Sequence, residues 1–135
     1  MEDGHTYLCV EDDEMNRLAV KAVFNRMMGI QRLVVFDDST DFISRLKLLE
    51  EHPTVFLLDV HVKPHNGFEM LKMLREDPEY HDAKVIAFTA SVMNEEVEKL
   101  RESGFDSAIG KPINVSVFPD LIRRIVQGEA IWYIT

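Results

Sequence analysis

Residues 55–67 read VFLLDVHVKPHNG, and the prediction of the fold depends on this segment. It begins with four consecutive apolar residues, Val55 to Leu58, and then changes at once to a carboxylate, Asp59. A short apolar run of this kind is typical of a β-strand that is covered on both faces. Similar runs occur at Tyr7–Val10, Leu33–Phe36, Val85–Phe88 and Ser107–Ile109. The sequence therefore predicts five buried strands.

Apolar residues at helical spacing separate these predicted strands. The stripes lie within residues 15–27, 42–49, 68–74, 93–100 and 118–125. Asn66 and Glu69 have the spacing of a capping box at the start of the third helix, and Gly29 and Gly104 are expected to end the first and fourth helices. This alternation predicts an α/β fold: a flavodoxin-like, doubly wound, five-stranded parallel sheet with helices on both faces. The strand order 2-1-3-4-5 is one of the two common arrangements of such sheets, and it is the order that we predict.

The composition is that of a globular domain, and the charge limits its partners. The chain has 135 residues, of which 46% are hydrophobic and 29% charged, so one domain with its own core is expected. The 15 basic and 24 acidic residues give a net charge of −9, which disfavours binding to nucleic acid and to anionic membranes. The single cysteine, Cys9, excludes an internal disulfide, and no apolar run approaches the ~20 residues of a membrane span. We therefore expect a cytoplasmic protein in which Cys9 is a core residue.

The chain continues beyond the fifth strand–helix repeat. We assign residues 1–127 to one domain and residues 128–135, GEAIWYIT, to an apolar C-terminal extension. The cluster Ile131, Trp132, Tyr133 and Ile134 would be unfavourable to leave in water. Two explanations stay open at this point, packing of the extension across its own domain or a homodimer contact.

Polar residues that can do chemistry follow four of the predicted strands. In doubly wound sheets ligands bind at the carboxyl ends of the strands, so the residues after each apolar run are candidates for a binding site. These residues are Glu11, Asp12 and Asp13 after the first strand, Asp59 after the third, Thr89 after the fourth and Lys111 after the fifth. Each has an ordinary explanation by itself, such as a helix cap for Asp13 or a turn residue for Asp59. Together they predict a cluster of carboxylates, one hydroxyl and one ammonium.

Such a cluster is suited to phosphoryl transfer with a divalent cation. Mg²⁺ prefers oxygen ligands, and it would relieve the repulsion among carboxylates that lie close together. We therefore predict Mg²⁺ as cofactor, held by Glu11 and Asp12, with Asp59 as the covalent phosphoryl acceptor. The Thr89 hydroxyl would donate to an oxygen of the transferring group, and Lys111 would neutralise part of its charge.

The sequence resembles the receiver domains of bacterial two-component response regulators. Four motifs carry the resemblance, namely VEDDEMNR at 10–17, DVHVKPHNG at 59–67, FTA at 88–90 and SGFDSAIGKPI at 103–113. They stand in the family's order, and Thr89 and Lys111 follow Asp59 by 30 and 52 residues. The resemblance extends to about Gln127 and is to stand-alone, chemotaxis-regulator-like receivers.

The resemblance implies a specific reaction. A sensor histidine kinase or a phosphotransfer protein would present phosphohistidine, and Asp59 would take the phosphoryl group in a Mg²⁺-dependent step that the receiver itself catalyses. Metal contacts would come from Asp12, from Asp59 and from the backbone carbonyl of His61, with Glu11 acting partly through water. The product would be an aspartyl phosphate.

The resemblance also implies how the phosphoryl group is read out. Thr89, followed by the small residue Ala90, would move toward the phosphoryl oxygen and shift the loop that follows. Ser91 would be a second determinant of the lifetime of the phosphoryl group. A cis peptide bond between Lys111 and Pro112 would hold the lysine over the phosphoryl site. Changed contacts with a downstream protein, which the sequence does not identify, would carry the signal.

Two positions depart from the family pattern. Ala108 stands three residues before the lysine, where the family often has Tyr or Phe, so the aromatic part of the switch is missing. Lys63 stands four residues after Asp59, where many receivers have proline, and Pro64 comes one position later. His61 in the same loop is either a solvated polar residue or a group beside the phosphoryl site that controls the access of water.

The resulting prediction is a single-domain response regulator, which accepts and slowly loses a phosphoryl group but is not an enzyme with turnover. A phosphatase of the haloacid dehalogenase kind would need a second acid two residues after the nucleophile, where His61 stands. A flavin binder would need a hydroxyl- and glycine-rich loop in place of residues 11–14, EDDE. Two alternatives stay open, a phosphate-independent interaction module and a relay carrier without an output of its own.

Overall fold

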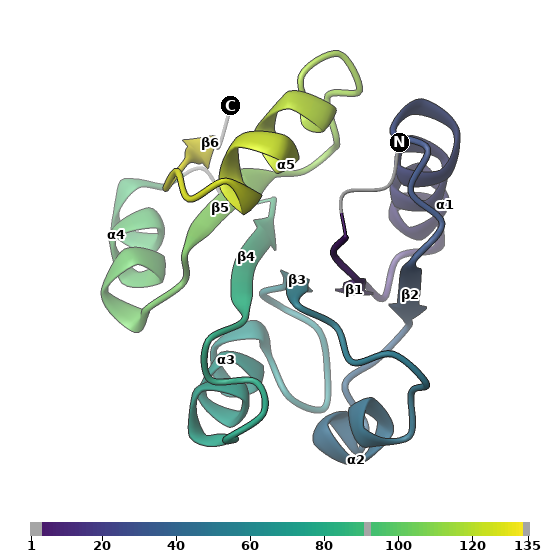
Figure 1. The fold of residues 1–135 in the computed structure, drawn as a ribbon. Helices are drawn as coiled ribbons and strands as arrows, with labels where there is room; N and C mark the ends of the chain where they lie inside the picture. The colour runs from purple at the N-terminus through teal and green to yellow at the C-terminus, as the bar shows by residue number, and fades with distance from the viewer. Residues whose placement is uncertain (1–3, 91–92, 134–135) are drawn as a thin grey trace.

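Strands and helices alternate in the computed structural model, which describes residues 4–90 and 93–133 (Figure 1). The strands are β1 (Tyr7–Val10), β2 (Leu33–Phe36), β3 (Val55–Asp59), β4 (Lys84–Thr89), β5 (Ser107–Gly110) and β6 (Trp132–Tyr133). The helices are α1 (Glu14–Ala22), the π-helix η1 (Val23–Met27), α2 (Phe42–Lys47), α3 (Gly67–Glu76), α4 (Asn94–Ser103) and α5 (Phe118–Val126). The predicted α/β class and the alternation of strands and helices are thus confirmed.

The sheet has one strand more than the sequence predicted. All neighbouring strands pair in parallel, in the order β2-β1-β3-β4-β5-β6, so the predicted order of the first five strands is confirmed. The prediction of a five-stranded sheet is wrong, because Trp132 and Tyr133 pair with Ala108 and Ile109 of β5. The physical reason is the edge of β5, whose unpaired backbone groups would otherwise face water.

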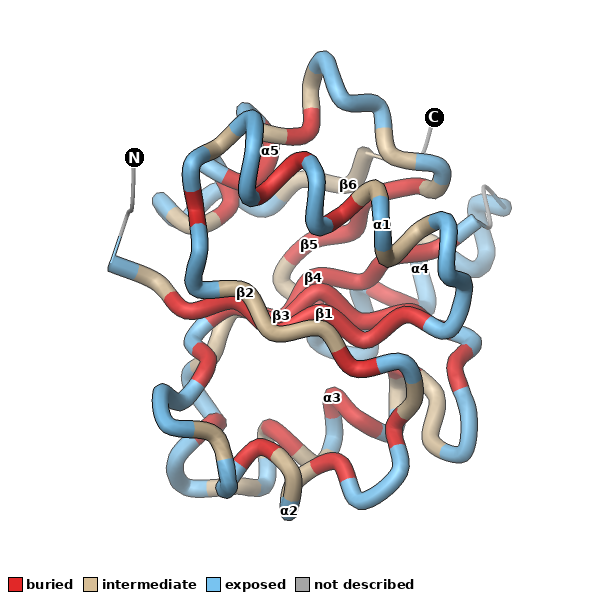
Figure 2. The backbone as a smooth tube through the Cα atoms, turned by 90° about the vertical axis from the view of Figure 1, so that its right-hand side faces the viewer, coloured by how far each residue is buried: buried red, intermediate tan, exposed pale blue. Residues whose placement is uncertain are grey.

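The sheet lies between two helical layers, and a hydrophobic core fills the space on each side. Figure 2 shows the buried backbone of the central strands with α1 and α5 on one side and α2 and α3 on the other. One core joins the sheet to α2, α3 and α4, and the other joins it to α1, η1 and α5. Cys9 lies in the centre of β1, where burial raises the pKa of its thiol, so its predicted place in the core is confirmed. No helix in the described part of the chain is long and apolar enough to cross a membrane.

The helix ends follow the predicted signals in most places. Asp13 caps α1 by accepting a hydrogen bond from the backbone N–H of Asn16, and Asn66 and Glu69 form the predicted capping box of α3. Gly104 ends α4 with a positive φ of 102°, which favours glycine. The first apolar stripe is divided between α1 and the π-helix η1, a change that the apolar spacing did not predict.

The described part of the C-terminal extension packs against its own domain. The backbone N–H of Ile131 donates to the buried Ser107 hydroxyl, and its carbonyl accepts from Ala108. Trp132 is half-buried against the core that contains Ala108, and the Arg101 guanidinium lies 5.0 Å from the centre of its ring. The described part of the extension thus packs across its own domain, which is one of the two explanations that the sequence left open. Ile134 lies outside the described residues.

Replacing Trp132 should therefore destabilise the domain. We expect Trp132→Ala to lower the free energy of unfolding by about 1–3 kcal/mol, because a half-buried indole loses its contacts with the sheet edge. Leu48→Ala is the matched control, since Leu48 is 86% exposed and should change stability by less than about 0.5 kcal/mol. Chemical denaturation measures both values, and equal stability of the two variants would contradict the packing of β6.

Candidate functional site

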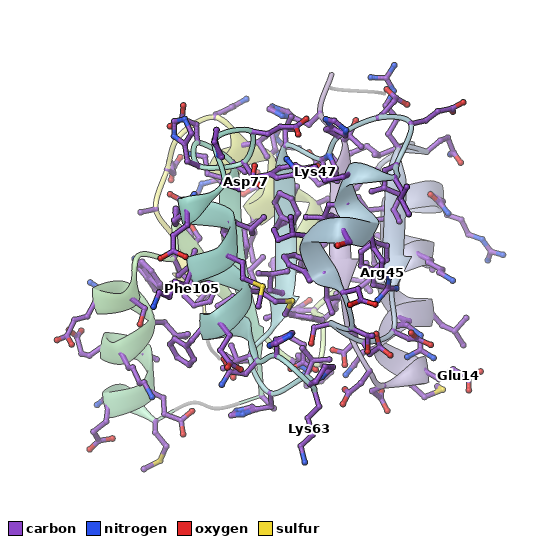
Figure 3. All side chains as sticks on the ribbon, turned by 90° about the horizontal axis from the view of Figure 1, so that it is seen from below. Glu14, Arg45, Lys47, Lys63, Asp77 and Phe105 are labelled. Atoms are coloured by element: carbon purple, nitrogen blue, oxygen red, sulfur yellow. The ribbon has the colours of Figure 1, made fainter. Side chains whose placement is uncertain are left out.

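The sheet order brings the predicted site residues to one edge. Asp59 and Thr89 end β3 and β4, while Glu11 and Lys111 directly follow β1 and β5. Because β1, β3, β4 and β5 are successive neighbours in the sheet, their carboxyl ends meet at the same edge. Figure 3 shows Glu14, at the start of α1, at the same end of the molecule as Lys63 of the loop that follows β3.

A lysine ammonium lies between two buried carboxylates at this edge. Lys111 Nζ is 2.8 Å from Glu11 Oε1 and 3.2 Å from Asp59 Oδ1. Glu11 is fully buried and Asp59 is 2% exposed, so water screens these charges only weakly. The second oxygen of Glu11 accepts a hydrogen bond from the backbone N–H of Asp13 at 2.9 Å. These contacts fix the positions of both carboxylates.

The surroundings shift the two carboxyl groups in opposite directions. Burial by itself would raise the pKa of Asp59, but the His61 backbone N–H at 3.0 Å and the Lys111 ammonium outweigh it and lower the pKa. Burial raises the pKa of Glu11 to about 7, although Lys111 favours its charged form. The two carboxylates in turn outweigh the effect of burial on Lys111 and raise its pKa. Asp59 is therefore the group that is held ionised at neutral pH.

Three carboxylates at this edge fit a small divalent cation. One carboxylate oxygen each from Glu11, Asp12 and Asp59 lie within 4.8 Å of one another. All three donors are hard oxygen ligands, which Mg²⁺ prefers, and the exposed Asp12 leaves a side open for its water ligands. The residues present thus fit a Mg²⁺ site.

Thr89 lies beside this cluster and is tied to the lysine through the backbone. Its carbonyl accepts the Lys111 N–H at 2.8 Å, and its side chain is buried. Together with His61 and Lys99 it lines a hollow of about 150 Å³ between the β3–α3 loop and α4. The next residue, Ala90, is exposed, whereas Ser91 lies outside the described residues.

The turn between Lys111 and Pro112 has the backbone form that was expected. The peptide bond between these residues is cis, so this prediction is confirmed. Pro112 is exposed, whereas the Lys111 side chain is only 12% exposed. The ammonium therefore points into the site while the proline faces solvent.

Arg17, the last residue of the motif VEDDEMNR, has a role at the site that the sequence did not predict. Its Nη1 donates to the backbone carbonyls of Glu11 at 3.1 Å and Asp12 at 2.8 Å. A side chain of α1 thus holds the backbone of the two acidic residues that follow β1. Such contacts are directed to the backbone, and no pattern of side chains in the sequence marks them. The one available signal was position, because Arg17 lies in the first part of the helix that Asp13 caps.

Gly67 allows α3 to begin directly against the acceptor strand. A Cβ atom at this position would lie 2.9 Å from Val60 Cα and 3.1 Å from the carbonyl oxygen of Asp59. Its backbone N–H donates to the Val60 carbonyl at 3.0 Å. Only glycine fits this close approach of two backbone segments without a shift of Asp59.

A parallel sheet with this arrangement of acids, hydroxyl and lysine at one edge is the arrangement expected of a receiver domain. The family model described as "Response regulator receiver domain" matches residues 7–123, and the chain belongs to this family. The chain is 30% identical over 124 residues to the polar-differentiation response regulator DivK of Brucella anthropi, a match that covers 91% of this chain and 96% of DivK. To DivK of Brucella ovis it is 36% identical over 81 residues, which cover 60% of this chain and 65% of that protein.

A solved structure shows the same fold. The receiver domain of sensor histidine kinase PA1611 from Pseudomonas aeruginosa PAO1 superimposes with a TM-score of 0.78. The match covers 93% of this chain and 99% of that domain, at 19% sequence identity. At this identity the similarity establishes the fold alone, and it agrees with the flavodoxin-like sheet of the first five strands.

Replacing Gly67 should disturb the site as well as the fold. We expect Gly67→Ala to lower stability by about 1–3 kcal/mol, because the added methyl group meets backbone atoms that cannot rotate away. It should also weaken the response of the melting temperature to Mg²⁺, since the displaced backbone carries Asp59. Gly128→Ala is the control for the Mg²⁺ response: its positive φ also makes the substitution unfavourable, but Gly128 follows α5 and contacts no atom of the site, so the response should be retained. A full Mg²⁺ response in Gly67→Ala would contradict this account of the close approach.

Adding Mg²⁺ should stabilise the protein through the acidic cluster. At a Mg²⁺ concentration ten times the dissociation constant, we expect a gain of about 1.4 kcal/mol in the free energy of unfolding. Asp12→Ala should abolish this gain because it removes one of the three carboxylates. Asp82→Ala, which removes a carboxylate whose side chain is 92% exposed and lies elsewhere, should retain it. Thermal denaturation with and without Mg²⁺ decides, and an equal gain in all three proteins would exclude the site.

Proposed function

We propose that the chain is a single-domain response regulator whose Asp59 accepts a phosphoryl group from the phosphohistidine of a sensor histidine kinase or phosphotransfer protein. One observation carries the proposal: Asp59 is a buried carboxylate whose pKa is lowered, beside a lysine ammonium and two further acids. Membership in the receiver family supports the same conclusion. The complete set of acid, hydroxyl and lysine favours this function over a phosphate-independent interaction module.

The geometry supports a direct displacement at phosphorus. An oxygen of the ionised Asp59 forms the new bond to phosphorus, the phosphorus–nitrogen bond of phosphohistidine breaks, and the released imidazole keeps the electron pair and takes up a proton. The Lys111 ammonium would neutralise negative charge on the phosphoryl oxygens, and the Thr89 hydroxyl would donate to one of them. Bound Mg²⁺, held by Glu11, Asp12, Asp59 and the carbonyl of His61, would supply further charge neutralisation. The PA1611 receiver contains a magnesium ion in its active-site cleft, which supports this choice of cofactor.

The proposed output is a change in protein contacts and not a turnover reaction. Acceptance and slow loss of the phosphoryl group are the only chemistry that we assign to the chain. Movement of Thr89 toward the phosphoryl group, together with Ala90 after it, would alter the surface near α4 and carry the signal. A relay carrier without its own output is the remaining alternative, and it uses the same acceptor chemistry.

Exposed apolar side chains beside the site offer a contact surface for the phosphoryl donor. Met15 and Leu18 on α1 are 72% and 52% exposed, and Val115, which follows the lysine loop, is 47% exposed. Exposed apolar groups around a reactive centre are typical of transient protein contacts.

The acceptor should be detectable by mass. Incubation with acetyl phosphate and Mg²⁺ is expected to add the mass of one phosphoryl group to the intact protein, because a small donor can replace phosphohistidine. The adduct should be absent without Mg²⁺ and in Asp59→Ala. Intact-mass spectrometry measures it, and an adduct that persists in Asp59→Ala would refute the assignment of the acceptor.

The contact surface can be tested separately from the chemistry. We expect Leu18→Glu to slow transfer from a phosphorylated kinase or phosphotransfer protein at least about tenfold, as for a residue central to an interface. Phosphorylation by acetyl phosphate should not change. Leu48→Glu is the control. Leu48 is also exposed, but it follows α2, which lies on the other side of the sheet from α1 (Figure 2). Transfer from the protein donor at an equal rate in both variants would exclude α1 as the contact surface.

A further inference from the structure

A single buried side chain holds the middle of the phosphoacceptor loop, by which we mean residues 60–66. Ser39, in the loop between β2 and α2, is fully buried. Its hydroxyl donates to the His65 carbonyl at 2.6 Å and accepts from the His65 N–H at 2.7 Å. The Ser39 N–H donates to the Lys63 carbonyl at 3.3 Å. One residue from a neighbouring loop thus fixes the backbone of two loop residues.

The side chains of the loop do not explain this position. In Figure 3 the Lys63 side chain extends away from the body of the protein, and residue 63 is exposed. The hydrogen bonds to Ser39 use only the backbone of Lys63 and His65. The anchor therefore acts on the path of the chain and would persist if the two side chains were changed.

Ser39 is itself held in place by Arg45 of α2. Arg45 Nη1 donates to the carbonyls of Asp38 at 3.2 Å and Thr40 at 3.0 Å, the residues on either side of Ser39. It also contacts the Asp38 carboxylate at 2.9 Å, and its guanidinium lies 3.9 Å from the centre of the Phe36 ring. The serine is thus presented by a loop that a charged, stacked side chain keeps rigid.

The anchored loop reaches directly to the acceptor carboxylate. The His61 N–H donates to Asp59 Oδ1 at 3.0 Å, two residues before the part that Ser39 holds. At the other end of the loop, Gly67 is joined to the Val60 carbonyl. A shift of residues 63–65 would therefore change where the His61 amide and carbonyl lie relative to Asp59.

We propose that Ser39 is a positioning residue for the phosphoacceptor loop, which it holds so that the His61 backbone stays beside the Asp59 carboxylate. This inference rests on the proposed function, because it assigns Ser39 a role in Mg²⁺ binding and phosphoryl acceptance at Asp59. Removing the hydroxyl would leave both backbone groups of the half-buried His65 without this partner. The loop would then relax toward solvent, and the His61 contact with Asp59 would weaken.

Ser107 provides a control that separates positioning from stability. It is also a fully buried serine whose hydroxyl accepts a backbone N–H, from Ile131 at 2.9 Å. It lies at the start of β5, at the opposite end of the strand from the lysine. Ser39→Ala and Ser107→Ala therefore remove the same chemical group from equally buried places, and a general loss of stability should appear in both.

The experiment measures Mg²⁺ binding by titration calorimetry on the full chain, with Mg²⁺ alone as the probe. We expect Ser39→Ala to raise the dissociation constant roughly three- to tenfold, as for the loss of one or two hydrogen bonds. The phosphorylation rate with acetyl phosphate should fall in the same variant, and backbone amides of residues 61–66 should exchange hydrogen faster. Ser107→Ala should match the wild type in all three measurements. Equal Mg²⁺ affinity and equal exchange in the two variants would overturn the proposal.

A second variant covers the case in which Ser39→Ala does not fold. Arg45→Met keeps an apolar side chain against Phe36 but removes the donors to Asp38 and Thr40, which flank Ser39. It should therefore weaken Mg²⁺ binding, as Ser39→Ala does. Unchanged Mg²⁺ affinity in Arg45→Met would then count against the proposal. Failure of the proposed function would instead appear in the wild type, as an absent Asp59 adduct, while hydrogen exchange of the loop would still show whether Ser39 holds it.

Discussion

The structure of the site depends on one interaction, the contact of the Lys111 ammonium with the buried carboxylates of Glu11 and Asp59. The three groups come from three different strand ends, so the contact exists only if β1, β3, β4 and β5 pair in the observed order. Two carboxylates in a buried place without a cation between them would be strongly unfavourable. The lysine thus offsets the repulsion between the two carboxylates at these strand ends. Gly67 allows the close approach of α3 to Asp59, and Arg17 holds the backbone of Glu11 and Asp12.

This interaction leaves the site short of positive charge. Burial raises the pKa of Glu11 to about 7, which means that the folded state binds a proton at this group more tightly than the unfolded state does. Stability from this group is therefore fully present at low pH and declines as the pH rises from about 4.5 to about 7. The exposed Asp12 adds a further negative charge. A divalent cation would offset this charge, so part of the net charge of −9 has a local chemical meaning.

Much of the site was predictable because each residue directly follows or ends a strand that the sequence makes recognisable. Asp59, Thr89 and Lys111 needed only the apolar runs and the rule that parallel strands end at one edge. The roles of Ser39 and Arg17 were not predictable, because their partners are backbone groups that leave no trace in the side-chain pattern. The strand β6 was missed for a related reason, since two residues show no period and only the open edge of β5 explains their pairing.

The most direct test of the central contact is the stability of Lys111→Met without divalent cations. The free energy of unfolding should fall by about 3–5 kcal/mol, because two buried carboxylates lose the cation between them. Adding Glu11→Gln to this variant should restore a large part of the loss, since one of the two charges is then removed while the shape is kept. Chemical denaturation measures the free energy of unfolding of each variant. A value for Lys111→Met within about 0.5 kcal/mol of the wild type would contradict the account. A double variant that is no more stable than Lys111→Met would contradict it as well.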